Sequence, residues 1–375
     1  MIRILHVVGS MNMGGIETYI MNMYRTVNKS EIQFDFLVHT KEESFYDSEI
    51  LAHGGYIYHI SPRRNGIIKY IKELKVFFRE KGSKYSNIHF HLSSLSNISH
   101  IIQASKYCNS KIILHGHSTS EGGKYIHKVL HKLNQERVEK YVDHYLACSN
   151  TVGNWMYGKR DFLVINNGID PQKFAFSSDD RLNTRKKLSI SDDEIVIGHV
   201  GSFSYAKNHK RIIDIFRDFH LEVNNSKLLL VGDGSDMKLI KTYVEKNDLK
   251  QDVLFLGIQK NVSPFLSAID VLLMPSFYEG FPVSLVEAQS SGLPCIVSDS
   301  ITKEVKLSNL VTFINLSESN DVWSMSIRNN LNKNISRFDY LEIMENSDFS
   351  LEKSIQPIIN IYLDKSGGNY EAKSD

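Results

Sequence analysis

The sequence has few cysteines, almost no net charge and no long apolar run, and each of these shortages excludes a class of protein. Its 375 residues include only three cysteines, Cys108, Cys148 and Cys295, with no CxxC pair and no Cys/His metal spacing. We therefore exclude a disulfide-rich scaffold and predict a reduced, cytosolic chain without structural zinc. The 42% apolar and 23% charged residues are ordinary globular values, which excludes a disordered or fibrous chain.

Charge and hydropathy argue against two further classes. The chain has 44 Lys+Arg against 43 Asp+Glu, a net charge of +1, whereas a dedicated nucleic-acid-binding protein usually has a clear basic excess. No segment approaches the ~18 consecutive apolar residues of a membrane span. The apolar run at 2–8 is too short for a signal peptide, and we interpret it as the first β-strand of a cytoplasmic protein.

Short apolar runs instead alternate with helical patterns along most of the chain. Such alternation predicts parallel sheets with helices on both faces, arranged in two doubly wound α/β domains. The expected strands are 2–8, 34–39, 56–60, 87–92, 111–115, 144–148 and 162–165 in the first half, and 195–200, 227–231, 253–256, 271–274 and 295–298 in the second.

A stretch rich in turn residues marks the expected domain boundary. Residues 166–171 are dense in asparagine, glycine, aspartate and proline, and a polar stretch continues to residue 194. The apolar residues of the last segment recur at helical spacing, which predicts a helix that packs back toward the first domain and a polar tail. The predicted division is an N-terminal domain at 1–166, a linker at 167–194, a second domain at 195–348, and the C-terminal helix and tail at 349–375.

Ligands of open parallel sheets bind beyond the carboxyl ends of the strands, so the loops after the expected strands are candidate sites. Three of these loops contain glycine: 9–17 with Gly14 and Gly15, 201–210 with Gly201 and Lys207, and 231–235 with Gly232 and Gly234. Glycine lets a backbone approach a ligand closely, and a following helix start offers N–H groups to an anion. Each loop also fits a plain turn, and Lys207 also fits a solvated surface lysine. The spacing is not GxGxxG, so a nicotinamide dehydrogenase is not supported.

The most informative loop follows the expected strand 271–274. Glu279 lies in this loop, Pro282 fits the first position of a helix, and Glu287 lies about a turn and a half inside that helix. The segment thus offers two carboxylates to accept hydroxyl hydrogen bonds and, between them, a helix start suited to a diphosphate. A sugar nucleotide presents its groups in that order: sugar hydroxyls, diphosphate, ribose hydroxyls.

With these motifs the sequence resembles family 4 of the retaining glycosyltransferases, and within it the bacterial exopolysaccharide and capsule glycosyltransferases. The most specific part is the E-x7-E motif from Glu279 to Glu287, and 14–17, 207–208 and 231–234 match further family positions. The resemblance implies the GT-B fold, which has two Rossmann-like domains and an interdomain cleft. It also implies a nucleotide-sugar donor, UDP-linked, with no cofactor and no metal; no D-x-D stands at a strand end.

The resemblance assigns a role to each matching position. Glu279 would contact the donor sugar, Lys207 would neutralise the departing diphosphate, and His115 would lie near the reacting sugar; these are the expected catalytic residues. Two weaker acceptor-side candidates, His91 and His117, are also compatible with structural histidines. The expected donor-binding residues are Gly14, Gly15, Gly201, Lys207, Gly232, Gly257, Gly280, Phe281, Pro282, Val283 and Glu287.

One position departs from the family pattern. Ser202 stands where the family usually has an arginine paired with the lysine, so a diphosphate would lose one bidentate partner. Lys210 or Arg211 could replace it, and both could equally face solvent. The mechanism implied is retention of anomeric configuration, with catalysis by positioning and electrostatic stabilisation of the leaving diphosphate.

The expected acceptor is a glycan or a polyprenyl-diphosphate-linked oligosaccharide at the inner membrane face. Residues 63–84 hold eight basic and two acidic side chains, and a basic amphipathic helix there could contact anionic lipid. The same helix could instead pack its apolar stripe on the sheet and keep its basic face in water. Two other functions stay open: a nucleotide-sugar epimerase of the same architecture, and a glycan-binding accessory subunit with little activity, which Ser202 favours.

Overall fold

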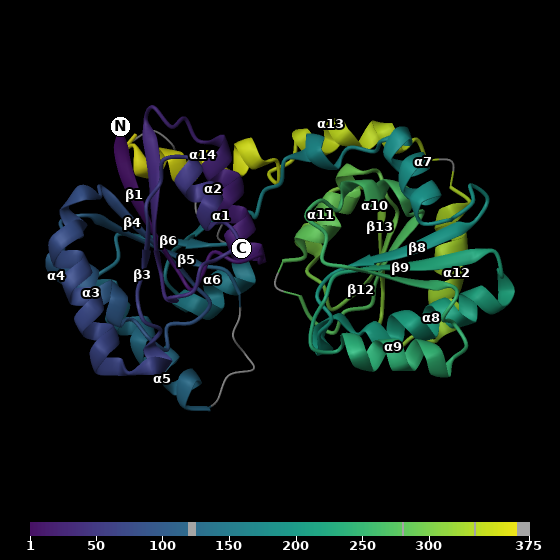
Figure 1. The fold of residues 1–375 in the computed structure, drawn as a ribbon, viewed down its shortest axis with the longest axis horizontal. Helices are drawn as coiled ribbons and strands as arrows, with labels where there is room; N and C mark the ends of the chain where they lie inside the picture. Colours follow the sequence, from purple (N-terminus) through teal and green to yellow (C-terminus); the bar gives the residue numbers. More distant parts are fainter. Residues whose placement is uncertain (119–124, 280, 334, 366–375) are drawn as a thin grey trace. The chain divides into compact units, whose positions relative to one another are not determined.

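In the computed structural model, the chain forms two compact α/β units (Figure 1). The described residues are 1–118, 125–279, 281–333 and 335–365. Unit 1 consists of residues 1–168 and the C-terminal segment from Leu351, and unit 2 is Ile169–Ser350. Every strand pairing within the two sheets is parallel, so the predicted class of two parallel α/β domains is confirmed. Within the described residues, no helix is long and apolar enough to cross a membrane.

Unit 1 contains a seven-stranded sheet in the order β3-β2-β1-β4-β5-β6-β7. Its strands are β1 (Ile2–Val8), β2 (Ile32–Val38), β3 (Ile57–His59), β4 (Asn87–Leu92), β5 (Lys111–Gly116), β6 (His144–Ala147) and β7 (Leu163–Val164). Its helices are α1 (Gly15–Thr26), α2 (Asp47–Ala52), α3 (Ile67–Lys81), α4 (Ser99–Tyr107), α5 (Tyr125–Arg137), α6 (Asn150–Tyr157) and α14 (Leu351–Tyr362).

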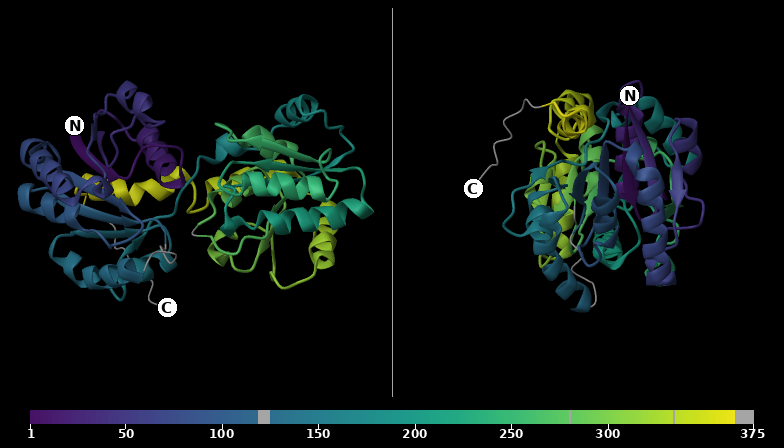
Figure 2. Two further views of the ribbon diagram at one scale, coloured as in Figure 1. Left: turned by 60° about the horizontal axis from the view of Figure 1, so that its bottom comes forward. Right: turned by 90° about the vertical axis from the view of Figure 1, so that its left-hand side faces the viewer.

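Side chains alternate along each strand, so each strand contributes to two cores, one on each face of the sheet. Different helices cover the two faces. Leu5 of β1 and Phe90 of β4 belong to one core with α3, α4 and α6. Ile4 of β1 and Ile113 of β5 belong to the other core, with α1 and α14. The histidines of β1, β4 and β5 therefore point toward the α1/α14 layer, because they alternate with the residues of the first core. Figure 2 gives two further views of these layers.

Unit 2 contains a six-stranded sheet in the order β10-β9-β8-β11-β12-β13. Its strands are β8 (Ile195–Val200), β9 (Ser226–Val231), β10 (Val253–Gly257), β11 (Val271–Met274), β12 (Cys295–Ser298) and β13 (Val311–Ile314). Its helices are α7 (Ser178–Lys187), α8 (His209–Glu222), α9 (Met237–Lys246), α10 (Ser263–Ala268), α11 (Val283–Ser290), α12 (Asn320–Leu331) and α13 (Tyr340–Glu345). Helices α8, α9 and α12 cover one face of the sheet, and α10 and α11 cover the other.

The sequence predicts a linker at 167–194. In the structure most of this stretch is part of unit 2. Helix α7 anchors it there through Arg185, whose side chain is fully buried. Its Nη2 donates to Asp270 Oδ2 at 2.7 Å and its Nε donates to the Ala268 carbonyl at 3.0 Å. A buried guanidinium needs such acceptors, so the polar sequence reflects a buried polar network rather than a free connection.

The C-terminal helix α14 belongs to unit 1. Ile355, Ile358 and Tyr362 are buried in the core that also contains α1 and the sheet residues Ile4 and Phe34. The chain thus passes between the two units twice, near residue 168 and near residue 350.

Candidate active site

The strongest polar contact at the strand ends of unit 2 joins Lys207 to Glu279. The ammonium Nζ of Lys207 donates to Oε1 of Glu279 at 2.7 Å and to Oε2 at 2.6 Å. Both side chains are largely buried, with 15% and 8% of their surface exposed. The structure therefore brings together two of the three predicted catalytic residues, as an ion pair that is partly shielded from water.

Two loops that follow neighbouring strands hold this pair in place. Lys207 ends a short 3₁₀ turn after β8, and Glu279 lies in the loop after β11. The Phe277 N–H donates to the Ala206 carbonyl at 2.8 Å, and Asn208 Nδ2 donates to the Pro275 carbonyl at 3.0 Å. These bonds join the two loops, so the cation and the carboxylate are positioned by a common backbone framework.

Asn208 occupies the left-handed region with φ 54° and ψ 46° at the start of α8. Asparagine adopts this region more easily than most residues. Asn208 is the N-cap residue of α8, but its side chain caps no helix N–H group. It bonds to the facing loop instead, so its main structural effect is on the site rather than on the helix.

Three predicted donor-binding glycines lie at the ends of three adjacent strands. Gly201 follows β8, Gly232 follows β9, and Gly257 ends β10. The Gly232 N–H donates to the Gly257 carbonyl at 2.9 Å. Gly232 has φ 138°, and a Cβ there would lie 2.0 Å from the Gly201 carbonyl oxygen, so no other residue fits without a shift. The strand ends therefore present backbone, and not side chains, to any ligand that approaches this edge.

Glu287 is the fifth residue of α11, and its side chain is half-buried. Desolvation raises the pKa of its carboxyl group to about 7, because burial disfavours the charged form. The second acid of the E-x7-E motif is thus close to its protonation midpoint at neutral pH, unlike an acid in open water.

The raised pKa of Glu287 predicts a specific dependence of stability on pH. The unfolded state loses this proton near the ordinary glutamate pKa and the folded state only near 7, so the stability contribution of this group falls as pH rises between the two values. We expect Glu287→Gln to raise the free energy of unfolding by about 2 kcal/mol at pH 8 and to change it little at pH 5. Urea melts at both values measure this, with the exposed Glu342→Gln as the control. A gain that is equal at pH 5 and pH 8 would contradict the assignment.

The residues between the two acids are arranged partly as expected. Pro282 is the residue before the helix rather than its first residue, and it is buried. The ring of Phe281 stacks on that of Phe349, with 4.9 Å between the ring centres. This contact anchors the loop before α11 in unit 2. The sequence predicts that Val283 binds the donor. In the structure its N–H donates to the Phe281 carbonyl at 3.0 Å and is therefore not free to bind a phosphate. Gly280 lies outside the described residues.

The replacement of the family arginine by Ser202 is not compensated in this structure. The Ser202 hydroxyl is exposed and lies 3.4 Å from the Ser204 hydroxyl. The Lys210 ammonium lies 5.2 Å from the centre of the Tyr243 ring, and Arg211 donates to the backbone carbonyl of Glu318. Lys207 is therefore the basic side chain that the described residues place beside Glu279.

In unit 1, the glycine loop lies at the start of α1, as expected. Gly14 is the N-cap of this helix and Gly15 its first residue. A Cβ on Gly14 would lie 2.3 Å from Oε2 of Glu17, so a carboxylate already occupies the space beside Gly14. Partial burial raises the pKa of Glu17. An anion that approached these glycines would meet that acid as well as the helix N–H groups.

The three predicted histidines of unit 1 lie together in a larger group. We call His6, His89, His91, His115 and His117 the histidine cluster; all five are buried. His115 is completely buried on β5, directly opposite His91 of β4 in the sheet register. Burial holds the pKa of His117 at about 3 and those of His91 and His115 well below the usual value, so all three are neutral at pH 7.

Sequence reasoning missed two features beside the Lys207–Glu279 pair. The Ser276 hydroxyl donates to Oε1 of Glu279 at 2.7 Å and fixes the carboxylate from the other side. The exposed ring of Tyr205 stacks on Phe277 at 4.9 Å. Tyr205 lies two residues before Lys207, and Phe277 lies two residues before Glu279. No pattern in a single sequence indicates that the two rings stack.

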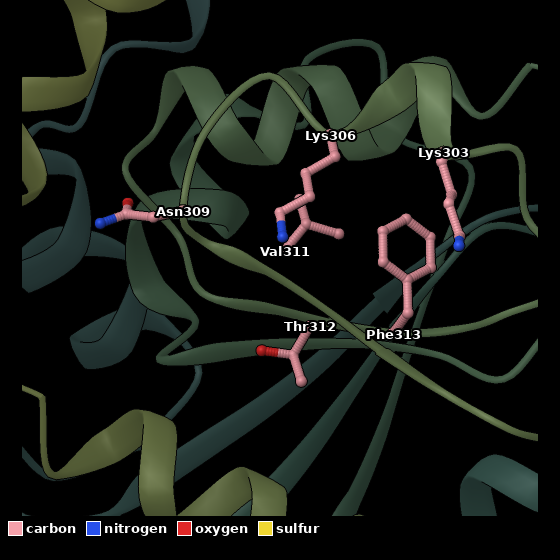
Figure 3. A pocket seen from close by; sticks show the side chains of 6 residues that line it. All are labelled: Lys303, Lys306, Asn309, Val311, Thr312 and Phe313. Atoms are coloured by element: carbon pink, nitrogen blue, oxygen red, sulfur yellow. The ribbon is translucent and has the colours of Figure 1, made fainter.

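A pocket of about 520 Å³ lies elsewhere in unit 2, at the edge strand β13 (Figure 3). Lys303, Lys306 and Asn309 line one side of it, and Thr312 and Phe313 of β13 line the other. None of the residues predicted from the sequence to form the site lines this pocket.

Comparison with known proteins agrees with the fold. The profile of the family "Glycosyl transferases group 1" matches residues 180–315, and that of "Glycosyltransferase Family 4" matches residues 13–173. The chain is 30% identical over 371 residues to the putative glycosyltransferase EpsF of Bacillus subtilis, covering 96% of each chain. It is 22% identical over 375 residues to the capsular polysaccharide biosynthesis glycosyltransferase CapH of Staphylococcus aureus, covering 98% of this chain and 100% of CapH. A crystal structure of Anabaena HepE in complex with UDP-glucose has a similar fold, with a TM-score of 0.78 at 17% identity and coverage of 97% and 100%.

Proposed function

The chain belongs to the glycosyltransferases of group 1 and family 4, and on that premise we propose that it is a retaining enzyme that uses a UDP-linked sugar donor. Its role in polysaccharide biosynthesis follows from relatives such as CapH. We propose as the acceptor a hydroxyl of a glycan or of a polyprenyl-diphosphate-linked oligosaccharide at the cytoplasmic face of the membrane.

The ion pair between Lys207 and Glu279 is the observation that supports this function most directly. Without substrate, each charge neutralises the other at 2.6–2.7 Å. A donor diphosphate offers Lys207 a more highly charged partner, and the Glu279 carboxylate is then available to accept hydrogen bonds from sugar hydroxyls. The pair would thus exchange one internal contact for two contacts with the two halves of the donor.

The chemistry proposed for this site is stabilisation of the departing diphosphate. Charge accumulates on the diphosphate as the sugar bond breaks, and Lys207, largely buried, counters it in a medium of lower dielectric constant than water. We propose that the diphosphate approaches the backbone at Gly201 and Gly232, which carries no side chain. We propose that these groups, without a metal ion at the diphosphate, are sufficient for transfer.

Slow hydrolysis of the donor tests this function without knowledge of the acceptor. An active glycosyltransferase transfers some sugar to water, so we expect the protein to release UDP from at least one member of a UDP-sugar panel. We expect Glu279→Ala to reduce this release by about 10²-fold or more, because the sugar loses the carboxylate that orients it. Glu342→Ala, which removes an exposed acid of the same unit, should leave the rate unchanged.

Two results would contradict the proposal in different ways. UDP release that is equal in the wild type and in Glu279→Ala would show that the site is assigned wrongly. Release of an inverted sugar, detected by NMR of the fresh product, would show that the mechanism is not retaining.

A second candidate function is a glycan-binding accessory subunit with little transfer activity. The uncompensated serine at position 202 favours it, because the diphosphate has lost a bidentate partner. The same assay distinguishes the two functions, since an accessory subunit should release no UDP while it still binds oligosaccharide. Conversion of one UDP-sugar into another without an acceptor would instead indicate an epimerase.

Contact with the membrane surface is a separate part of the proposal. Helix α3 buries Tyr70, Leu74 and Phe78 in the core, so its apolar stripe packs on the sheet. Lys69, Lys72 and Lys75 are exposed, as are the apolar side chains at its start. An exposed basic face of this kind is suited to an anionic lipid surface.

Charge reversal on α3 tests this contact. We expect the protein to sediment with phosphatidylglycerol vesicles at low salt, and the triple change of Lys69, Lys72 and Lys75 to Glu to weaken binding about 100-fold, because each basic side chain contributes about 1 kcal/mol. Reversal of Lys238, Lys241 and Lys246 on α9 removes the same charge from unit 2 and should have a smaller effect. Equal losses in the two triple variants would show that net charge, and not α3, governs binding.

A further inference from the structure

The histidine cluster of unit 1 contains more imidazole groups than the proposed sugar transfer uses. The rings of His115 and His117 are 4.1 Å apart, those of His91 and His117 are 5.1 Å apart, and those of His91 and His115 are 5.8 Å apart. One ring nitrogen from each of these three residues lies within 4.8 Å of the other two. Of these three residues, only His115 was expected near the reacting sugar. The expected sugar site therefore does not explain why all three rings converge.

Several nitrogens of the cluster lack the partners that buried polar atoms normally have. Among the described residues, neither ring nitrogen of His115 has a hydrogen-bond partner, and Nδ1 of His117 has none. A buried donor or acceptor without a partner destabilises the folded state. His115 is therefore a fully buried imidazole with both nitrogens unsatisfied, and it lies against His91 and His117, whose Nδ1 and Nε2 atoms bond to each other at 2.9 Å.

We propose that His91, His115 and His117 bind a divalent transition-metal ion, with Zn²⁺ as the best match to three imidazole ligands. Around a tetrahedral Zn²⁺ each bond is about 2.0–2.1 Å long, so ligand nitrogens lie about 3.3 Å apart. The 2.9 Å between His91 Nδ1 and His117 Nε2 is slightly shorter than this, and all three nitrogens lie within 4.8 Å of one another, so the side chains would shift to accommodate the ion. Three protein ligands leave a fourth position for water or another small ligand.

His6 supports this assignment through a contact with the second ring nitrogen of His91. Its Nδ1 lies 2.9 Å from Nε2 of His91. If His91 binds the ion through Nδ1, its proton is on Nε2 and donates to His6 Nδ1, which sets both the tautomer and the orientation of the ligand ring. Metal-binding histidines usually have such a partner on their second nitrogen.

A deeper set of three, His6, His89 and His91, also has converging nitrogens. Two observations favour the set with His115 and His117. The deeper set uses His89, whose Nδ1 is already 2.6 Å from the Tyr362 hydroxyl. His6 and His89 have no exposed surface, whereas His117 is 6% exposed, so the set with His117 lies nearer the surface.

Cobalt provides a direct probe of this site that does not depend on transferase activity. We expect the full-length protein, prepared without a polyhistidine tag and stripped with EDTA, to bind one Co²⁺ with the visible absorption of a four-coordinate complex, and Zn²⁺ to displace it. His115→Gln and His117→Gln should each weaken Co²⁺ binding at least about tenfold. His117 is the safer variant, since it lies at the edge of the core and its loss should disturb folding less.

The matched control is His100→Gln, which removes a buried imidazole of unit 1 outside the cluster and should leave the spectrum and affinity unchanged. Absence of the four-coordinate spectrum at saturating Co²⁺ would overturn the proposal and leave the cluster as a chain of imidazole hydrogen bonds. Equal weakening in the His117 and His100 variants would overturn it as well. Loss of binding in His89→Gln but not in His117→Gln would place the ion in the deeper set and overturn the assignment made here. Because the readout is the metal itself, these results do not depend on whether the proposed sugar transfer is correct.

Discussion

Lys207→Ala is expected to lower the rate of sugar transfer at saturating donor by about 10²–10³-fold. The reason is that Lys207 is the cation that the structure places beside Glu279, and neither Lys210 nor Arg211 points to the same place. Since Ser202 supplies no positive charge, Lys207 is the basic side chain of the described part of unit 2 on which we expect stabilisation of the leaving diphosphate to depend. The measurement is the initial rate of UDP release with and without acceptor.

The same variant should also lose stability, and a second change separates the two effects. Removal of one member of a largely buried ion pair leaves the other charge without a partner, so we expect the free energy of unfolding to fall by about 2–3 kcal/mol. The double variant Lys207→Ala/Glu279→Gln should recover most of this stability and none of the activity. Lys210→Ala is the matched control and should keep both. Recovery of transfer in the double variant would show that Lys207 acts only by supporting the fold.

Gly232→Ala should have the largest effect on stability among the glycines of the site. Its φ of 138° is a conformation that residues with a Cβ rarely adopt, and a Cβ there would lie 2.0 Å from the Gly201 carbonyl oxygen. Backbone strain and overpacking each cost about 1–3 kcal/mol, so we expect the free energy of unfolding to fall by about 3 kcal/mol. Urea denaturation measures the loss, and affinity for UDP should fall with it because the loop must move.

Gly257→Ala is the control for this prediction. Gly257 also has a positive φ, 65°, but no atom lies within 4 Å of the place that its Cβ would take. The expected loss is therefore only the left-handed backbone penalty of about 1 kcal/mol. If the two variants lose the same stability, backbone conformation alone explains both, and the close approach of Gly232 to the β8 loop is unimportant.

Much of the fold could be predicted from the sequence because its signals are local. Apolar runs such as Ile2–Val8 and Cys295–Ser298 form strands with the expected bounds, since they are buried on both faces of a parallel sheet. The family and the GT-B fold could be predicted as well, because the E-x7-E segment resembles that of family 4 glycosyltransferases and lies within a few residues of the chain.

Other elements were missed because their stability is not local. Strand β13 has four residues at the sheet edge and depends on its pairing with β12. Helix α12 is rich in asparagine and serine, which are poor helix formers, and it is held by the buried Trp323 and Ile327. The attachment of helix α7 to unit 2 was missed as well, because its polar sequence suggests a linker and the attachment depends on Arg181 and Arg185, which both pair with the distant Asp270.

The sequence by itself determined the class of this protein: two α/β domains and a glycosyltransferase family, with Glu279, Glu287 and Lys207 as candidate site residues. Periodicity and short motifs carry that information, since neighbours in the chain form each strand, turn and helix start. Only the tertiary structure decided which of these groups touch. Lys207 and Glu279 are 72 residues apart yet share a hydrogen-bonded ion pair, and five histidines from separate parts of unit 1 form one buried cluster. Such contacts depend on strand order and register, which local chain chemistry does not encode.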